Sequence, residues 1–141
     1  MQAVMTPAET MAYLDEIFPQ VRGEFDIEEM DGVRTVVRLK VADRHLRPGG
    51  TVSGPSMFAL ADVTAYIATL ARIGKVPLAV TTNVSLDFMR KPEAGKDLIA
   101  EARLLKLGRT LSVVDILLFS EGMADPVARS TMTYAIPPQR G

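Results

Sequence analysis

The sequence predicts an α+β fold, in which an antiparallel sheet of about six strands wraps around one long central helix, with a short N-terminal helix before them. Three observations predict this fold. Apolar and polar side chains alternate over residues 33–41, residues 54–73 are apolar on every side of a helix, and four strand-like segments follow Pro77. A chain of 141 residues suits one core, because a domain of this size buries roughly 70% of its unfolded surface. We therefore expect a single domain over residues 1–141.

The N-terminal segment has the signals of a short helix. Thr6 can cap the helix, Pro7 suits its first position and Glu9 can close a capping box, so the helix should run to about Phe18. The same segment carries acids and no Lys or Arg, whereas a secretion signal begins with basic residues. We expect the protein to stay in the cytoplasm.

A hairpin is predicted next. Residues 33–41 alternate with the period of a half-buried strand. Asp31-Gly32 before them is a turn signal, so residues 24–30 are predicted as the partner strand. A loop rich in Arg, Pro and Gly follows over residues 43–52.

The long helix is predicted over residues 54–73. Ser53 can cap its start, Pro55 fits its first turn, and Gly74 suits its C-terminal cap. Because apolar side chains occur on every face, this helix should be buried in the core, with the sheet wrapped around it.

After Pro77 the pattern switches to strands. The predicted strands are residues 78–89, 97–107, 110–119 and 127–136, and short turn-type connections separate them. Consecutive strands with such connections are expected to pair as an antiparallel meander.

Composition narrows the possible chemistry. The absence of cysteine excludes disulfides, thiolate metal sites and a cysteine nucleophile. The chain has 16 Lys+Arg against 17 Asp+Glu and no basic run longer than Arg90-Lys91, so binding of nucleic acid is not expected. The longest apolar stretch, residues 57–71, is interrupted by Asp62 and is shorter than the ~20 residues that a bilayer requires, so no membrane span is expected.

Asp62 is the only acid in the predicted long helix. Asp is a poor helix former, and an unpaired buried carboxylate is costly. Asp62 could be tolerated in this helix if it lay at an interface between subunits or if its side chain capped a neighbouring loop. Asp62 also lies two turns after the helix start at Gly54, where unpaired N–H groups stabilise negative charge. The two residues fit a site that needs one base and one anion-stabilising group.

The spacing of Gly54 and Asp62 adds a geometric constraint. Eight residues along a helix correspond to about 12 Å, so one carbonyl group cannot contact both. If two copies place their helices antiparallel across a two-fold axis, Gly54 of one chain faces Asp62 of the other. We therefore expect a homo-oligomer that is at least a dimer. We also expect two such dimers to join as a homotetramer, a dimer of dimers.

Two segments carry a resemblance to a known family. From His45 to Asp62 the sequence reads HLRPGGTVSGPSMFALAD, and from Thr81 to Pro92 it reads TTNVSLDFMRKP. With the Leu-Gly-Arg-Thr turn at residues 107–110, this spacing resembles the PaaI-like branch of the hot-dog-fold acyl-coenzyme A thioesterases. The resemblance implies the hot-dog fold and hydrolysis of an acyl-coenzyme A thioester to free acid and coenzyme A. It implies no metal and no cofactor other than the coenzyme A of the substrate.

The resemblance also implies catalytic roles. In this family the backbone N–H at the position of Gly54 polarises the thioester carbonyl, and the acid at the position of Asp62 is nucleophile or general base. A Ser or Thr that assists the acid in some relatives matches Thr81 best. Alternation in this strand instead predicts an apolar face opposite Thr81, formed by Leu78, Val80, Thr82 and Val84.

Substrate-binding residues are implied in the same way. Phosphates of coenzyme A lie on basic side chains near strand ends in this family, which matches Arg90, Lys91 and Arg109. The family commonly has His where Ser53 stands and Asn or Gln where Arg47 stands. Arg has five donors, a fixed charge and no acceptor. We expect Arg47 to face the substrate and pair with a carboxylate or phosphate; pairing with Asp62 across a dimer is the alternative.

Other chemistries fit the sequence less well. A triad of Ser53, His45 and Asp62 is disfavoured because residues 50–54 lack the G-x-S-x-G elbow. His45 is the only histidine and is expected to be an exposed loop residue rather than a zinc ligand. Hot-dog dehydratases use a His that the central helix lacks. The strongest alternative is an acyl-coenzyme A binding module that has lost the chemistry, which Ser53 and Arg47 favour.

Overall fold

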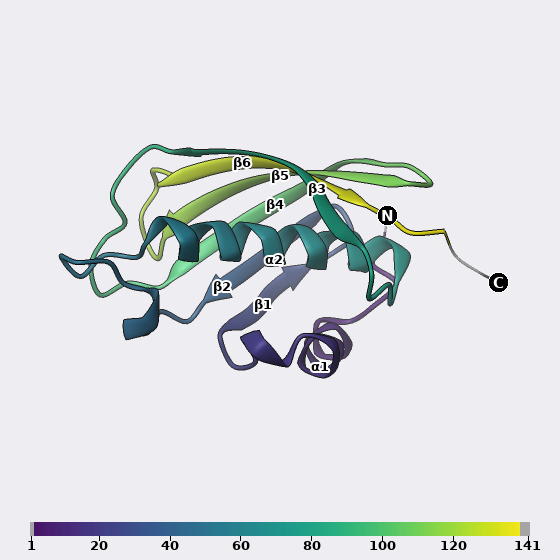
Figure 1. Cartoon of the computed structure of the whole chain (residues 1–141), viewed down its shortest axis with the longest axis horizontal. Helices are drawn as coiled ribbons and strands as arrows, with labels where there is room; N and C mark the ends of the chain where they lie inside the picture. Colours follow the sequence, from purple (N-terminus) through teal and green to yellow (C-terminus); the bar gives the residue numbers. More distant parts are fainter. Residues whose placement is uncertain (1, 139–141) are drawn as a thin grey trace.

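The strands of the computed structural model, which describes residues 2–138, join in one six-stranded antiparallel sheet (Figure 1). In chain order they are β1 (Phe25–Met30), β2 (Arg34–Leu39), β3 (Val80–Phe88), β4 (Leu98–Leu107), β5 (Leu111–Ser120) and β6 (Ala128–Ala135). The helices are α1 (Pro7–Ile17) and α2 (Gly54–Ile73), with short 3-10 helices η1 (Pro19–Val21) and η2 (Asp43–His45). The predicted α+β fold is confirmed.

The N-terminal helix and the first hairpin begin with the predicted local signals. Glu9 N–H donates to Thr6 Oγ1 at 3.1 Å and Thr6 N–H donates to Glu9 Oε1 at 3.0 Å, which is the capping box. In the β1–β2 turn, Asp31 Oδ1 accepts the Val33 N–H at 2.8 Å, and Gly32 has a φ of 95°, which glycine adopts readily. Local hydrogen bonds therefore define both elements.

The long helix α2 crosses one face of the sheet (Figure 1). It packs against β2, β4, β5 and β6, and these contacts form the core. The largest fully buried side chains include Leu39, Leu60, Ile67, Leu70, Leu98, Ile116, Leu118 and Met132. By length and composition α2 could cross a membrane, but 67% of its most apolar stretch is buried in the protein, so the core accounts for its apolarity.

Burial of α2 is incomplete, contrary to the prediction of a helix enclosed by the sheet. Pro55 and Ala59 are exposed, and Phe58 between them is 38% exposed. Asp62 is half-buried on the same side of the helix, one turn further along. The first half of α2 therefore has one face that the sheet of its own chain does not cover.

The sheet order corrects the predicted meander of four strands. Across the sheet the order is β1-β2-β4-β5-β6-β3, so β4, β5 and β6 form the meander while β3 pairs with β6 at the far edge. The connection over residues 89–97 contains Pro92 and is longer than a tight hairpin turn. It lets the chain cross from that edge to the middle of the sheet, where β4 pairs with β2.

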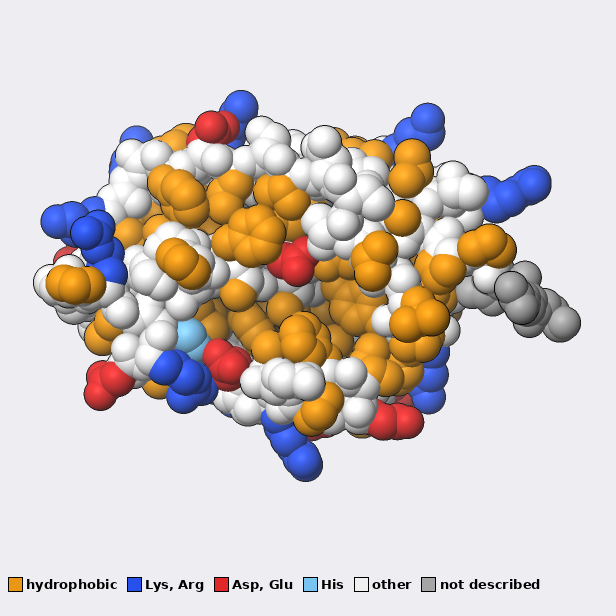
Figure 2. Space-filling model, viewed as in Figure 1, with side chains coloured by type: hydrophobic (Ala, Val, Ile, Leu, Met, Phe, Trp, Pro, Cys, Tyr) orange, Lys and Arg blue, Asp and Glu red, His pale blue; other side chains and the backbone are white. Residues whose placement is uncertain are grey.

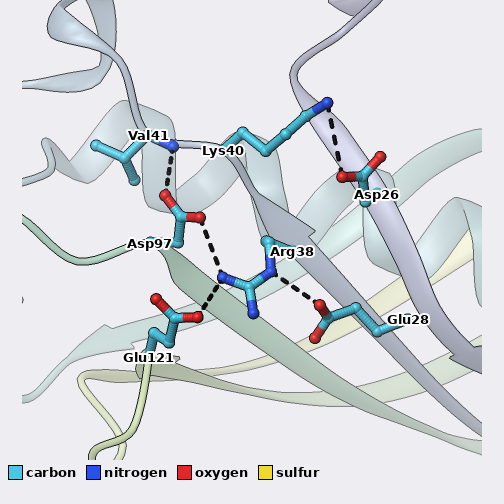
Figure 3. A network of polar contacts seen from close by, with 7 residues as sticks. All are labelled: Asp26, Glu28, Arg38, Lys40, Val41, Asp97 and Glu121. Atoms are coloured by element: carbon cyan, nitrogen blue, oxygen red, sulfur yellow. Dashed lines mark hydrogen bonds and ion pairs between the residues drawn. The ribbon is translucent and has the colours of Figure 1, made fainter.

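A polar network ties several segments together (Figure 3). The Arg38 guanidinium donates to Glu28 at 2.8 Å, to Asp97 at 3.0 Å and to Glu121 at 2.7 Å. Asp97 also accepts the Val41 N–H at 2.9 Å. The hydrogen bonds to Glu28 and Glu121 raise the pKa of Arg38 above its ordinary value, so its charge is fixed. One side chain thus joins β1 and β2 to the start of β4 and the end of β5.

Candidate active site

The start of α2 presents a free amide group. Ser53 is extended, with φ −75° and ψ 157°, and its Oγ accepts the Ser56 N–H at 3.3 Å, so Gly54 is the first helical residue. Over residues 2–138, no protein acceptor takes the Gly54 N–H. The Phe88 ring lies close by, because a Cβ built at position 54 would be 3.5 Å from Phe88 Cζ. The Gly54 N–H can therefore donate to a ligand oxygen at the positive end of the helix.

A depression of about 460 Å³, here named the Gly54 hollow, opens at this helix start. Its lining consists of Arg47, Thr51, Val52, Gly54, Met57, Phe88, Met89, Arg90, Lys91 and Pro92. Three cations and no acid line it. Among the described residues, Arg47, Arg90 and Lys91 form no ion pair, whereas six other cations do, namely Arg22, Arg34, Arg38, Lys40, Arg44 and Arg129. Unpaired positive charge is therefore gathered beside the Gly54 N–H.

The other predicted substrate-binding residues lie outside this lining. Ser53 Oγ is engaged in the helix cap. Arg109 lies in the turn between β4 and β5, at the end of the sheet opposite the start of α2 (Figure 1). Arg90, in contrast, does line the hollow, and its side chain also donates to the Pro126 carbonyl at 2.8 Å. Of the five predicted substrate-binding residues, one chain brings three together with Gly54.

The Asp62 carboxylate is held by two hydroxyl groups. Thr81 Oγ1 donates to Asp62 Oδ1 at 2.5 Å, and the Tyr134 hydroxyl lies 2.7 Å from the same oxygen and 3.0 Å from the Asp62 carbonyl. In the part of the chain that the structure describes, donors to the carboxylate reach Oδ1 only. Oδ2 is therefore available to a water molecule or a substrate.

Tyr134 is suited to remain a donor. It is 4% exposed, and its ring stacks on Tyr66 with 5.8 Å between ring centroids. Burial, and then the charge of Asp62, raise the pKa of Tyr134 well above its ordinary value. The hydroxyl thus stays protonated and orients the carboxylate.

A β-bulge brings Thr81 to Asp62. Thr81 pairs with Tyr134 and Asn83 pairs with Thr133, so Thr82 is the extra residue on β3. The bulge shifts the alternation of side chains along β3, so that Thr81 lies on the inward face of the strand. Val84, Leu86 and Phe88 lie on the same face, because each pairs with a buried residue of β6. The predicted apolar face was therefore wrong for Leu78 and Val80, which are largely exposed, whereas Val84 packs against the core as predicted.

A second depression, the Asp62 hollow, has a volume of about 250 Å³. Its lining consists of Ile17, Phe18, Asp62, Tyr66, Pro77, Ala79, Val80, Thr81 and Tyr134. Figure 2 shows hydrophobic side chains gathered on the face of the molecule that α2 crosses. Gly54 does not line the Asp62 hollow, and Asp62 does not line the Gly54 hollow. Each hollow of one chain therefore holds one of the two expected catalytic groups.

The two tyrosines of this site were not predicted from the sequence. Tyr134 lies 72 residues from Asp62 in the chain, so no local pattern connects them. One signal was present: Tyr134 continues the inward series Ala128, Ser130 and Met132 on β6. A buried tyrosine needs a partner for its hydroxyl, and the lone acid of the central helix could supply one.

The prediction for His45 was wrong. The side chain is buried, with the residue 5% exposed, and its Nε2 lies 2.6 Å from Glu24 Oε1. Its Nδ1 accepts the Ala42 N–H at 2.9 Å. Both ring nitrogens are engaged away from Ser53 and Asp62, so the structure forms no Ser-His-Asp triad. Over residues 2–138, no group of three or more His, Asp or Glu side chains could hold a metal ion.

Comparisons with known proteins agree with this architecture. The family model of the thioesterase superfamily matches residues 49–127, more than half of the chain. A solved structure from Silicibacter sp. TM1040, provisionally described as a thioesterase, is 65% identical in sequence and superimposes with a TM-score of 0.92. The match spans 98% of this chain and 96% of the other. Human acyl-coenzyme A thioesterase 13 is 23% identical over 82% of each chain.

A third relative connects the chain to the PaaI branch. A variant of the phenylacetic acid degradation protein PaaI from Thermus thermophilus is 27% identical, with a TM-score of 0.72, over 84% of this chain and 99% of its own. The TM-score shows that this protein has the same fold as the chain described here, one long helix on a six-stranded antiparallel sheet. The chain therefore belongs to the thioesterase superfamily, as a hot-dog-fold thioester hydrolase of the PaaI-like kind.

Proposed function

We propose that the protein hydrolyses acyl-coenzyme A thioesters in a composite site, with the Gly54 N–H of one chain and Asp62 of a second copy. The observation that carries this proposal is the division of the two groups between two hollows of one chain. A thioester carbonyl bound at Gly54 cannot reach Asp62 about 12 Å further along the same helix. An antiparallel second copy of α2 would bring the two together.

The uncovered face of α2 supports such an assembly. Phe58 and its exposed neighbours lie between the two groups, and the adjacent edge strand β3 carries exposed Val80. An edge strand and an apolar helix face suit a two-fold mate of the same chain. The proposed assembly is at least a dimer, and a dimer of dimers is the further expectation.

The proposed chemistry uses the groups as they lie. As a general base, Asp62 Oδ2 takes a proton from water while the water oxygen attacks the thioester carbon. The carbonyl oxygen becomes an anion, which the Gly54 N–H stabilises. The C–S bond then breaks, and the coenzyme A thiolate takes up the proton. As a nucleophile, Asp62 would attack the thioester carbon, and the C–S bond would break to release coenzyme A as a thiolate and leave an acyl anhydride on Asp62. Water would then cleave the anhydride to the free acid and the Asp62 carboxylate, and the thiolate would take up the proton released. Thr81 and Tyr134 orient the carboxylate in either route.

The charged residues complete the proposal. Arg90 and Lys91 would bind phosphates of coenzyme A beside the Gly54 hollow, and Arg109 would bind them only if a second copy brings its turn to the site. Arg47 lies in the Gly54 hollow and is absent from the ion pairs of the described residues, which supports a substrate-facing role. Ser53 acts through the helix cap.

A complementation experiment tests the composite site. Gly54→Pro removes the N–H, and Asp62→Asn removes the base, so each variant alone should be inactive. In a mixed dimer one site carries both defects and the other carries neither, so random mixing should restore roughly a quarter of wild-type turnover. Free-thiol release from a panel of acyl-coenzyme A thioesters measures the activity.

The outcomes separate the alternatives. Restored turnover supports the composite site. A mixture that stays inactive, while the wild type is active, would show that each site lies within one chain. A wild type that binds acyl-coenzyme A but releases no thiol would establish the binding module instead.

A further inference from the structure

Glu24 and His45 form a buried polar pair that the proposed chemistry does not use. His45 Nδ1 accepts the Ala42 N–H, so the proton of the neutral ring lies on Nε2 and is donated to Glu24 Oε1 at 2.6 Å. A charged ring would carry a proton on Nδ1 as well, and that N–H would point at the Ala42 N–H, so the observed hydrogen bond requires the neutral ring. The ring is buried and both of its nitrogens are engaged by protein groups, so any effect on the reaction must act through other groups.

The backbone of His45 connects this pair to the start of α2. Its carbonyl accepts the Ser53 N–H at 2.8 Å. Beyond that contact, Leu46 pairs with Val52, and the Arg47 N–H donates to the Thr51 carbonyl at 2.9 Å. Residues 46–52 thus form a closed loop whose base is the contact between His45 and Ser53, and Gly54 follows directly.

Glu24 connects the same pair to the sheet. It directly precedes β1, and its carbonyl accepts the Lys40 N–H at 2.8 Å next to the β1–β2 pairing. The side chain of Arg44 reaches the same Glu24 oxygen from solvent at 3.5 Å, and the Arg44 side chain is 59% exposed. A continuous series of contacts therefore runs from the sheet through Glu24, His45 and Ser53 to Gly54.

We infer that His45 is a positioning residue, which together with Glu24 aims the Gly54 N–H at the thioester carbonyl. The inference rests on the proposed role of Gly54. A donor that acts on an oxyanion must be held in place before the reaction, and a misplacement of about 1 Å can cost a factor of about 100 in rate. The sheet is the rigid body that fixes the donor here.

The test compares variants that break the pair with variants that keep it. His45→Ala and Glu24→Ala should lower kcat about 10- to 100-fold and change KM less than about threefold, because the Gly54 donor acts mainly in the transition state. Glu24→Gln keeps an acceptor for Nε2–H and should retain kcat within about threefold. Arg44→Ala is the matched control, since it removes a charge beside the same carboxylate without touching the ring.

A spectroscopic measurement completes the test. The Gly54 amide resonance in 15N-labelled protein should shift in Glu24→Ala and not in Arg44→Ala, which also decides the matter if His45→Ala does not fold. Unchanged kcat in folded His45→Ala and Glu24→Ala, an equal loss in Arg44→Ala, or an unmoved Gly54 resonance would overturn the inference. If the resonance moves but wild-type turnover is absent, the positioning stands and the proposed function fails.

Discussion

The Gly54 hollow and the Asp62 hollow are built on the same helix by opposite means. The first is lined by exposed charge: Arg47 and Lys91 are exposed, without ion pairs among the described residues, around one free backbone N–H. The second is fixed: Asp62 is hydrogen-bonded by Thr81 and by a buried tyrosine. Under the proposed function, the long flexible cations would attract the substrate at one hollow, whereas the reacting carboxylate would need a single orientation at the other.

The largest effect should come from the fixed hollow. Asp62→Asn and Asp62→Ala should abolish turnover, because the proposed base or nucleophile is lost, while the protein still folds and binds acyl-coenzyme A. Free-thiol release on the best substrate measures turnover, and circular dichroism checks the fold. Turnover within a factor of two of the wild type would remove Asp62 from the mechanism.

The next effect concerns the helix start. Gly54→Pro removes the N–H, and the extended Ser53 backbone is compatible with a following proline. It should lower kcat about 100- to 1000-fold, as expected for loss of one oxyanion donor. Gly54→Ala is the matched control, because it adds a Cβ at ordinary contact distance from Phe88 and keeps the N–H. Equal losses in both variants would point to crowding rather than to the missing donor.

A smaller and selective effect is expected at Arg47. Arg47→Asn should lower kcat/KM about 10-fold for acyl groups that carry a carboxylate and leave simple aliphatic acyl groups nearly unchanged, since one charged hydrogen bond is lost. The measurement compares glutaryl- with butyryl-coenzyme A. A uniform gain on every thioester would instead show that Arg47 restrains Asp62 across the dimer.

The smallest effect concerns the pH dependence of stability. The folded protein holds the Tyr134 proton to higher pH than the unfolded chain does, because burial raises its pKa. Above about pH 10, where an unfolded tyrosine ionises, stability should therefore fall as pH rises. Tyr134→Phe should show a shallower decline between about pH 9 and 11 in urea unfolding. Parallel declines in the two proteins would mean that other groups control the alkaline limit.

Sequence signals were sufficient where an element depends on its own neighbours. The capping box at Thr6, the cap at Ser53 and the end of α2 at Gly74 all follow from contacts within a few residues. The same holds for the turn at Asp31. Such signals placed the element boundaries to within about two residues, as local capping chemistry allows.

Contacts between distant residues explain what the sequence could not reveal. The pairing of β3 with β6, and the bulge at Thr82, depend on how two separate strands fit over α2. His45 was predicted to be exposed, because the sequence around it gives no sign of its partner Glu24, which lies 21 residues away in the chain. The separation of Gly54 and Asp62 into two hollows could be anticipated from the helix rise alone, but the hydroxyl of Tyr134 could not.

The Arg38 network has a consequence for the lifetime of the fold. Two of its three partners lie 59 and 83 residues away in the chain, so it can close only after β2, β4 and β5 have aligned. Interactions that form after the folding transition state mainly affect the unfolding rate. Arg38→Met should therefore accelerate unfolding in stopped-flow denaturant jumps and leave the refolding rate nearly unchanged; slower refolding would place the network early instead. Arg38 would then govern how long the sheet persists rather than how fast it forms.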